Sequence, residues 1–164
     1  MDELTIEQAH DGFIDSKFTC RELIEYYLDR IRRYNSGIEN RVRSLQQQTH
    51  SNTSHTETSS ESVDNLNLNA ILAVSQTALQ EAEELDRQYA ENFRLLPLHG
   101  IPIIVKDCIA TAGLFTTYGS IKAKDNVPEE DATVIKKLKA AGAIILAKSA
   151  LSGKQISKQY DNEC

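Results

Sequence analysis

Two charged residues directly follow a short apolar segment, and of all the residues in this sequence they are the best suited to chemistry. The segment at 101–105 reads Ile-Pro-Ile-Ile-Val and predicts a buried strand, after which come Lys106 and Asp107. Burial disfavours the charged form of a lysine, and a neutral amine can act as a base near pH 7. The alternative is a lysine that reaches solvent from the rim of a sheet, and position alone favours that alternative.

The cysteines and histidines predict neither a disulfide framework nor a metal site. Cys20, Cys108 and Cys164 are few, odd in number and far apart, so we expect reduced thiols. The histidines, too, lack the spacing of metal ligands: His10, His50, His55 and His99.

Two helices are expected at the N-terminus. Thr5 with Gln8, and Thr19 with Glu22, have the spacing of capping boxes, in which a threonine hydroxyl satisfies an early helical amide. Asn35-Ser36-Gly37 supplies a stop for the second helix. The apolar stripe expected on that helix comprises Leu23, Ile24, Tyr27, Leu28 and Ile31.

Three later apolar runs predict short strands, at residues 69–74, 101–105 and 143–147, and the first of them is suited to a strand covered on both faces. Their alternation with helices predicts an α/β fold, with N-terminal helices followed by a mixed or parallel sheet and right-handed crossovers. Such sheets bind ligands beyond the carboxyl ends of their strands. The residues just after Val105 and Ala147 are therefore the first place to look for a site.

The helices between these strands have recognisable ends. Ser75 is expected to cap the first helix and Asp131 the second, and Gly142 stands just past the second helix. A loop rich in Gly, Thr and Ala separates the second strand from Asp131. The positions expected to face inward are Leu79, Ala82, Leu85 and Tyr89 in the first helix, and Val134, Ile135 and Leu138 in the second.

Composition excludes several classes of function. The formal net charge of −6 argues against a nucleic-acid-binding surface, and the densest basic cluster, Lys136, Lys137 and Lys139, is expected to be a solvated helix face. No apolar run reaches the roughly 18–20 residues of a membrane-spanning helix. The N-terminus lacks the pattern of a signal peptide, so a cytoplasmic location is expected.

One tract differs in character from the rest of the chain. Residues 44–62 are nearly all polar, and Leu45 is their only aliphatic residue. Such a tract cannot bury enough apolar surface to offset its ordering entropy. We therefore expect a disordered polar insertion within residues 44–64.

The lysine-bearing segment and several others resemble the amidase signature family. Residues 98–107, L-H-G-I-P-I-I-V-K-D, are similar to the family stretch L-x-G-I-P-x-x-V-K-D-N, and residues 116–120 are similar to its T-T-x-G-S turn. Residues 131–148 resemble its D-A-x-V-x-x-L-x-x-A-G-A-x-x-x-G-K. Residues 19–28 match its N-terminal helix, and residues 68–71 match the L-N-A of its first strand.

The resemblance implies hydrolysis of amide (C–N) bonds by a serine nucleophile, a bridging serine in a cis peptide, and a lysine. Lys106 matches the lysine position, which makes it the candidate catalytic general base. A small-molecule amide is the implied substrate, and neither a metal nor an organic cofactor is needed. Asp107 is expected to make a strand-end turn contact. Cys108 stands where the family usually has Asn, and we expect its thiol to lie on a core-facing loop.

The resemblance ends near Ser152, so we expect a partial amidase domain at residues 1–152 and an unmatched tail at 153–164. The family would continue into a Gly- and Ser-rich segment that supplies both serines and the oxyanion site. We expect the chain to lack both serines and to be inactive alone. Absent strands would leave a buried strand at an open edge, which predicts marginal stability or aggregation.

Alternative interpretations remain open. The polar tract and the tail could come from non-coding sequence read through or from a mispredicted exon junction, and an authentic insertion explains the tract nearly as well. The chain could also be a non-catalytic interaction module, although no partner motif supports this. A nucleotide-binding domain is disfavoured because no Gly-rich phosphate loop follows a strand. The sequence determines neither the amide substrate nor the protein partners.

Overall fold

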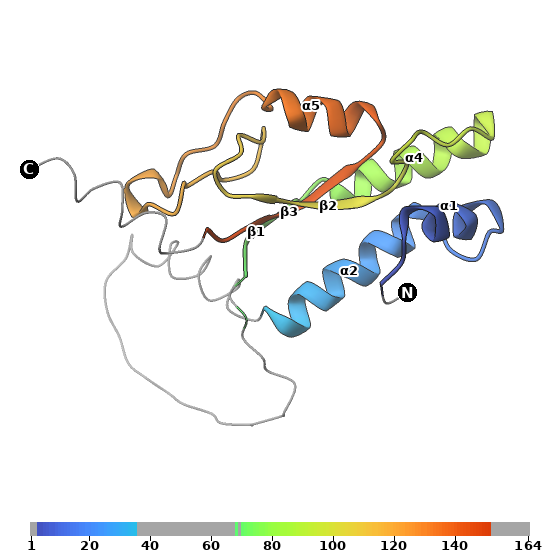
Figure 1. Cartoon of the computed structure of the whole chain (residues 1–164), viewed down its shortest axis with the longest axis horizontal. Helices are drawn as coiled ribbons and strands as arrows, with labels where there is room; N and C mark the ends of the chain where they lie inside the picture. Colours follow the sequence, from blue (N-terminus) through green and yellow to red (C-terminus); the bar gives the residue numbers. More distant parts are fainter. Residues whose placement is uncertain (1–2, 36–67, 69, 152–164) are drawn as a thin grey trace, which may run out of the picture.

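The computed structural model describes residues 3–35, 68 and 70–151 (Figure 1). The elements, in chain order, are α1 (Ile6–Ile14), α2 (Cys20–Tyr34), β1 (Ile71–Val74), α4 (Ala78–Asn92), β2 (Pro102–Lys106), the short 3-10 helix η1 (Ile121–Ala123), α5 (Thr133–Ala140) and β3 (Ile144–Ser149). The polar tract, for which we expected disorder, and the tail at 153–164 lie outside the described residues.

Both N-terminal capping boxes are confirmed. The Gln8 amide donates to the Thr5 hydroxyl over 3.1 Å, and the Gln8 side-chain oxygen accepts from the Thr5 amide over 2.9 Å. Thr19 and Glu22 make the same reciprocal pair at 3.1 and 2.8 Å. Each box satisfies two donors that the first helical turn would otherwise leave unpaired. As expected, α2 ends where Asn35 becomes the C-cap.

The strands form a mixed sheet in the order β1-β3-β2. β2 runs parallel to β3, whereas β1 runs antiparallel to β3. The mixed α/β architecture is therefore as expected, but β1 departs from the parallel orientation. The Ile71–Val74 strand is also only partly covered, because it lies at one edge of the described sheet.

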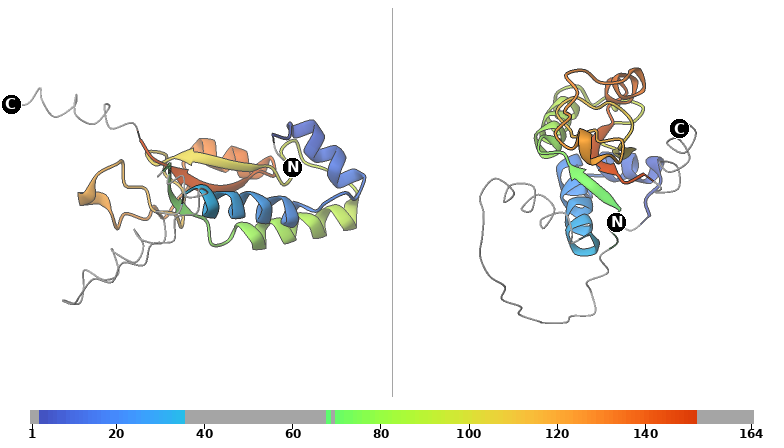
Figure 2. Two further views of the ribbon diagram at one scale, coloured as in Figure 1. Left: turned by 90° about the horizontal axis from the view of Figure 1, so that it is seen from below. Right: turned by 90° about the vertical axis from the view of Figure 1, so that its left-hand side faces the viewer.

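Helices cover the two faces of the sheet unequally. Figure 1 shows α5 on one side of the strands, with α1 and α2 on the other. Ile144 and Leu146 of β3 pack with α1, α2 and α4, whereas Ile145 packs with Val105 and with Ile135 of α5. The left view of Figure 2 shows α2 (light blue) and α4 (green) running alongside each other. The end of β2 is therefore covered on one face only: Val105 is buried, whereas Ile104 and Lys106 on the other face are exposed.

The starts of α4 and α5 differ from the sequence expectation. Thr77 rather than Ser75 precedes α4, and the Ser75 hydroxyl accepts a hydrogen bond from the Thr77 amide over 3.3 Å instead. Ala132 is the N-cap of α5, so Asp131 does not cap that helix. Val134 is half exposed (50%), in contrast to the inward position expected for it, while Ile135 is fully buried.

Candidate active site

Lys106 is the last residue of β2, and its side chain is exposed within the described part of the molecule. Its ammonium donates a hydrogen bond of 2.8 Å to the carbonyl oxygen of Ala150, just beyond the end of β3. The amine therefore stands at the edge where the two parallel strands finish together, which is where sheets of this class bind their ligands.

Asp107 is completely buried and organises the loop that follows. Its carboxylate accepts hydrogen bonds from the Thr117 amide (3.0 Å), the Thr117 hydroxyl (2.5 Å) and the Gly119 amide (3.0 Å). Gly119 adopts a left-handed φ of 72°, a conformation that glycine reaches without a steric cost. The strand-end turn contact expected for Asp107 is confirmed.

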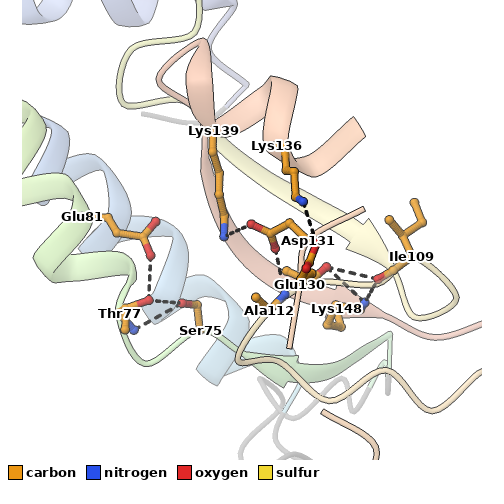
Figure 3. A network of polar contacts seen from close by, with 11 residues as sticks. Ser75, Thr77, Glu81, Ile109, Ala112, Glu130, Asp131, Lys136, Lys139 and Lys148 are labelled. Carbon is orange, nitrogen blue, oxygen red and sulfur yellow. Dashed lines mark hydrogen bonds and ion pairs between the residues drawn. The ribbon is translucent and has the colours of Figure 1, made fainter. Parts of the chain in front are cut away.

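A second lysine, Lys148 of β3, is fully buried beside Asp107. Its ammonium donates to the carbonyl of Ile109, as Figure 3 shows, and to the hydroxyls of Thr116 (3.0 Å) and Thr111 (3.4 Å). Burial lowers the pKa of Lys148, and the negative charge of Asp107 partly opposes this effect. The buried lysine of this site is therefore on β3, not on β2.

The position after Ala147 lies where the sequence predicts a site, but no sequence pattern predicts a role for Lys148. That role depends on the face of the sheet from which the Lys148 side chain extends. An irregularity in the pairing of β2 with β3 determines this face. The register between β2 and β3 shifts between Ile103 and Ile104, so that Val105 pairs with Lys148. Lys148 thereby shares the face of Val105, whereas unbroken alternation from Leu146 would turn it toward α1 and α2.

Neither of the two described cysteines makes a hydrogen bond to Lys106, Asp107 or Lys148 through its thiol. Cys108 is exposed and not core-facing, which corrects the expectation for its thiol. Cys20 is buried under α4, and burial raises the pKa of its thiol. Both thiols are free, and the described residues contain no group of acidic, histidine or cysteine side chains that could hold a metal ion.

The basic residues of α5 form ion pairs at the surface. Lys136 contacts Glu130 over 2.9 Å, and Lys139 contacts Asp131 over 2.8 Å (Figure 3). Asp131 also accepts a hydrogen bond from the Ala112 amide over 2.8 Å, which ties the start of α5 to the loop after β2. The expectation of a solvated basic face is consistent with these contacts.

An apolar groove of about 230 Å³ lies on the opposite side of β2 from Lys148. It runs between α1, α2 and β2, and Ile6, Tyr27 and Ile104 are among its lining residues. Ile104 and Lys106 are two residues apart on the strand, so they share a face. No helix in the described part of the chain is long and apolar enough to cross a membrane.

Comparison with known proteins gives a consistent result. A protein-family model described as Amidase matches residues 54–163. The chain is 28% identical over 163 residues to a glutamyl-tRNA(Gln) amidotransferase subunit from Alkaliphilus metalliredigens, a match that covers 99% of this chain and 27% of the relative. The chain thus spans about a quarter of the length of the curated relatives that it matches.

Two solved structures have the same fold. An amidase family protein from Bacillus anthracis superposes with a TM-score of 0.69 at 27% identity, covering 90% of this chain and 24% of that one. The peptide amidase of Stenotrophomonas maltophilia gives a TM-score of 0.67 at 27% identity, covering 92% and 25%. With the family model matching more than half of its residues, the chain belongs to the Amidase family.

Proposed function

We propose that this chain provides the lysine-bearing part of an amide-hydrolysing site, with Lys106 as general base. The observation that carries the proposal is the exposed amine at the common end of β2 and β3, 2.8 Å from the carbonyl of Ala150. The proposal is further supported by the motif at residues 98–107, which includes Lys106, and by the membership of the chain in the Amidase family. The proposed substrate class is a small-molecule amide.

The proposed chemistry needs a neutral amine at Lys106. The amine accepts a proton from a bridging serine hydroxyl, which in turn takes the proton of the nucleophilic serine. The serine oxygen then forms a bond to the amide carbon, and the C–N bond breaks as the proton returns to the leaving nitrogen. Water then gives a proton to the lysine amine through the bridging serine and forms a bond to the acyl carbon. The bond between that carbon and the serine oxygen breaks as the proton returns to the serine, which restores the starting protonation states.

The two serines of this scheme are proposed to come from sequence outside these 164 residues. Ser149 pairs with Lys106 in the sheet, but it belongs to a regular strand and not to a glycine-rich turn. Amides of a glycine-rich turn would supply the oxyanion donors that acyl transfer requires. On this proposal the 164-residue chain is inactive on its own.

The relatives suggest how such a site is used, without fixing its partners. By its name, the Alkaliphilus relative is one subunit of an amidotransferase, whereas the Stenotrophomonas relative is a peptide amidase. We propose amide hydrolysis as the shared reaction. We further propose a cytoplasmic location, on the grounds of the few, scattered cysteines.

The test begins with the source transcript, sequenced across and beyond the codons for residues 151–164. Its full translation product is then assayed for ammonia release from a panel of primary amides. Lys106→Met is expected to lower kcat by about 100-fold or more, the range of general-base catalysis. Lys137→Met is the matched control, since Lys137 is an exposed lysine on α5, and it should retain the parent rate.

Two outcomes would contradict the proposal. Hydrolysis that survives Lys106→Met would remove Lys106 from the mechanism. A translation product that ends at Cys164 and releases no ammonia would favour the non-catalytic alternative, and co-purifying proteins would then identify what it binds.

A further inference from the structure

Within the described part of the chain, the buried ammonium of Lys148 is bound by neutral oxygens alone. Its partners are the Ile109 carbonyl and the hydroxyls of Thr116 and Thr111, the latter two at 3.0 and 3.4 Å. No carboxylate accepts a hydrogen bond from it among the described residues, although the charge of Asp107 lies within electrostatic reach. Burying a cation in this way is costly, and an apolar side chain of similar size would avoid the cost. We therefore explain the buried position of Lys148 by the loop conformation that its hydrogen bonds hold, and not by a gain in the free energy of unfolding.

That geometry concerns the turn that begins at Lys106. The Ile109 amide donates to the Lys106 carbonyl over 3.0 Å, and the Ile109 carbonyl accepts from Lys148. The Asp107 amide donates to the Ser149 carbonyl over 3.0 Å. Consecutive residues of β3 thus hold both ends of the turn, one through its side chain and one through its backbone.

The same ammonium also fixes the far end of the loop. Thr116, which Lys148 contacts, directly precedes Thr117, whose amide and hydroxyl bind Asp107. Lys148 and Asp107 therefore hold adjacent residues of the loop from one face of the sheet. Lys106 extends from the opposite face, with its backbone clamped by these contacts.

We propose that Lys148 is a positioning residue, which fixes the 106–109 turn and the 111–117 loop so that the Lys106 amine is presented at the end of β2. Its role in hydrolysis rests on the function proposed above for Lys106. Its effect on the turn does not depend on that function.

The first test uses amide hydrogen exchange on the 164-residue chain, and needs no activity. Lys148→Met retains the length and the apolar stem but removes the donor. The Ile109 and Leu114 amides, which close the turn and the loop, should exchange at least about tenfold faster, while amides of α2 retain the parent rate. Unchanged exchange at Ile109 and Leu114 would overturn the proposal.

A matched pair at Thr116 keeps the test decisive if Lys148→Met fails to fold. Thr116→Val removes the acceptor hydroxyl at nearly constant shape, whereas Thr116→Ser retains it. We expect faster loop exchange in the valine variant and parent-like exchange in the serine variant. Equal behaviour of the two variants would contradict a role for the Lys148–Thr116 contact.

The second test measures Lys106 itself. Site-resolved acetylation compares the reactivity of Lys106 with that of Lys137 in the same sample. In Lys148→Met, the ratio should rise about fivefold, the factor expected from losing one hydrogen bond such as that from Lys106 to Ala150. A purely structural contact elsewhere in the loop would leave the ratio unchanged, and that result would overturn the proposal.

Kinetics on the full translation product separates this inference from the proposed function. Lys148→Met is expected to lower kcat about tenfold with little change in KM, since it displaces the base and not the substrate. Loss of activity in Lys106→Met together with parent activity in Lys148→Met would overturn this inference alone. Activity that survives Lys106→Met would refute the proposed function, while hydrogen exchange would still decide whether Lys148 holds the turn.

Discussion

At the scale of single residues, the end of the sheet combines two buried charges with different partners. Asp107 is satisfied by three donors from the 117–119 segment, and Lys148 by carbonyl and hydroxyl oxygens. The Lys-Asp pair that ends β2 stands out in the sequence because it follows an apolar run. Lys148 also follows such a run, but its burial depends on the shifted register with β2, which no local pattern encodes.

Replacing the Asp107 carboxylate should be strongly destabilising. Asp107→Asn places an amide N–H against donors that need an acceptor, and it removes the negative charge nearest to buried Lys148. We expect a loss of about 3 kcal/mol in the free energy of unfolding, typical of breaking a buried charged network. Urea denaturation measures the loss. The exposed Asp125→Asn is the control, and should change the free energy by less than about 0.5 kcal/mol.

The buried imidazole of His99 should make stability depend on pH. Burial lowers the pKa of His99, and the backbone of Leu85 in α4 opposes the shift. The nearby His10 of α1 lowers this pKa further, while Asp86 of α4 raises it. Because the unfolded chain then takes up a proton first, stability is fully present above the ordinary value of 6.5 and is lost as pH falls below it.

The measurement is a series of urea midpoints between about pH 7.5 and pH 5, across the ordinary range of histidine. The midpoint of the parent should fall with pH, and the slope should be shallower in His99→Leu. Parallel slopes for the two proteins would show that His99 is not the group responsible.

At the scale of the elements, features that depend on residues close in sequence were predicted correctly. The wrong predictions concern features that depend on contacts between distant parts of the chain. The capping boxes at Thr5 and Thr19 involve only residues three apart, so the sequence contains the whole interaction. Asp131 has the composition of a cap, but its carboxylate is taken by Ala112 and Lys139 instead. The antiparallel direction of β1 likewise depends on the path of the chain through the whole fold. A run of apolar residues does not determine that direction.

Two glycines allow the cost of a left-handed backbone to be separated from the cost of a steric clash. Gly113 and Gly142 have φ values of 75° and 92°. A Cβ at Gly113 would meet nothing within 4 Å, whereas one at Gly142 would lie 2.9 Å from the His99 Cα atom. Gly113→Ala should therefore cost about 1 kcal/mol, for backbone conformation alone.

Gly142→Ala should cost clearly more, about 3 kcal/mol, because the fixed backbone of the 96–99 turn cannot move away without disturbing the start of β2. Thermal or urea unfolding of both variants under one set of conditions gives the comparison. The turn is held by hydrogen bonds from the Leu98 amide to the Ala141 carbonyl and from the Gly100 amide to the Gly142 carbonyl. Equal losses of unfolding free energy in the two variants would mean that the turn moves aside despite these bonds.

At the scale of the whole molecule, the outer side of β2 is the exposed flank of the described sheet. β2 pairs only with β3 among the described residues, and Ile104 beside the apolar groove is 48% exposed. An unpaired strand edge next to apolar surface favours association with another chain.

We therefore expect the 164-residue chain, made alone, to be marginally stable or to self-associate at micromolar concentration. Sedimentation measures the association, and Ile104→Lys should reduce it by placing a charge at the edge. Thr133→Lys, an exposed position on α5, controls for added charge. A monomeric parent with a sharp, reversible two-state unfolding transition would contradict the expectation.

Because of the shifted register, β3 has one residue more than β2 between their paired positions. A deletion and an insertion in β3 should therefore have different effects on the sheet. Ile103 pairs with Ile145 and Ile104 with Ala147, which leaves Leu146 as the additional residue. Deleting a residue between 145 and 147 would remove the irregularity, and the pairing of Lys148 with Val105 would survive with the ammonium still on its own face. Inserting a residue there would turn that ammonium into the apolar layer beneath the sheet unless the strand distorted further. Loss of a residue from this strand should therefore be easier to accommodate than gain of one.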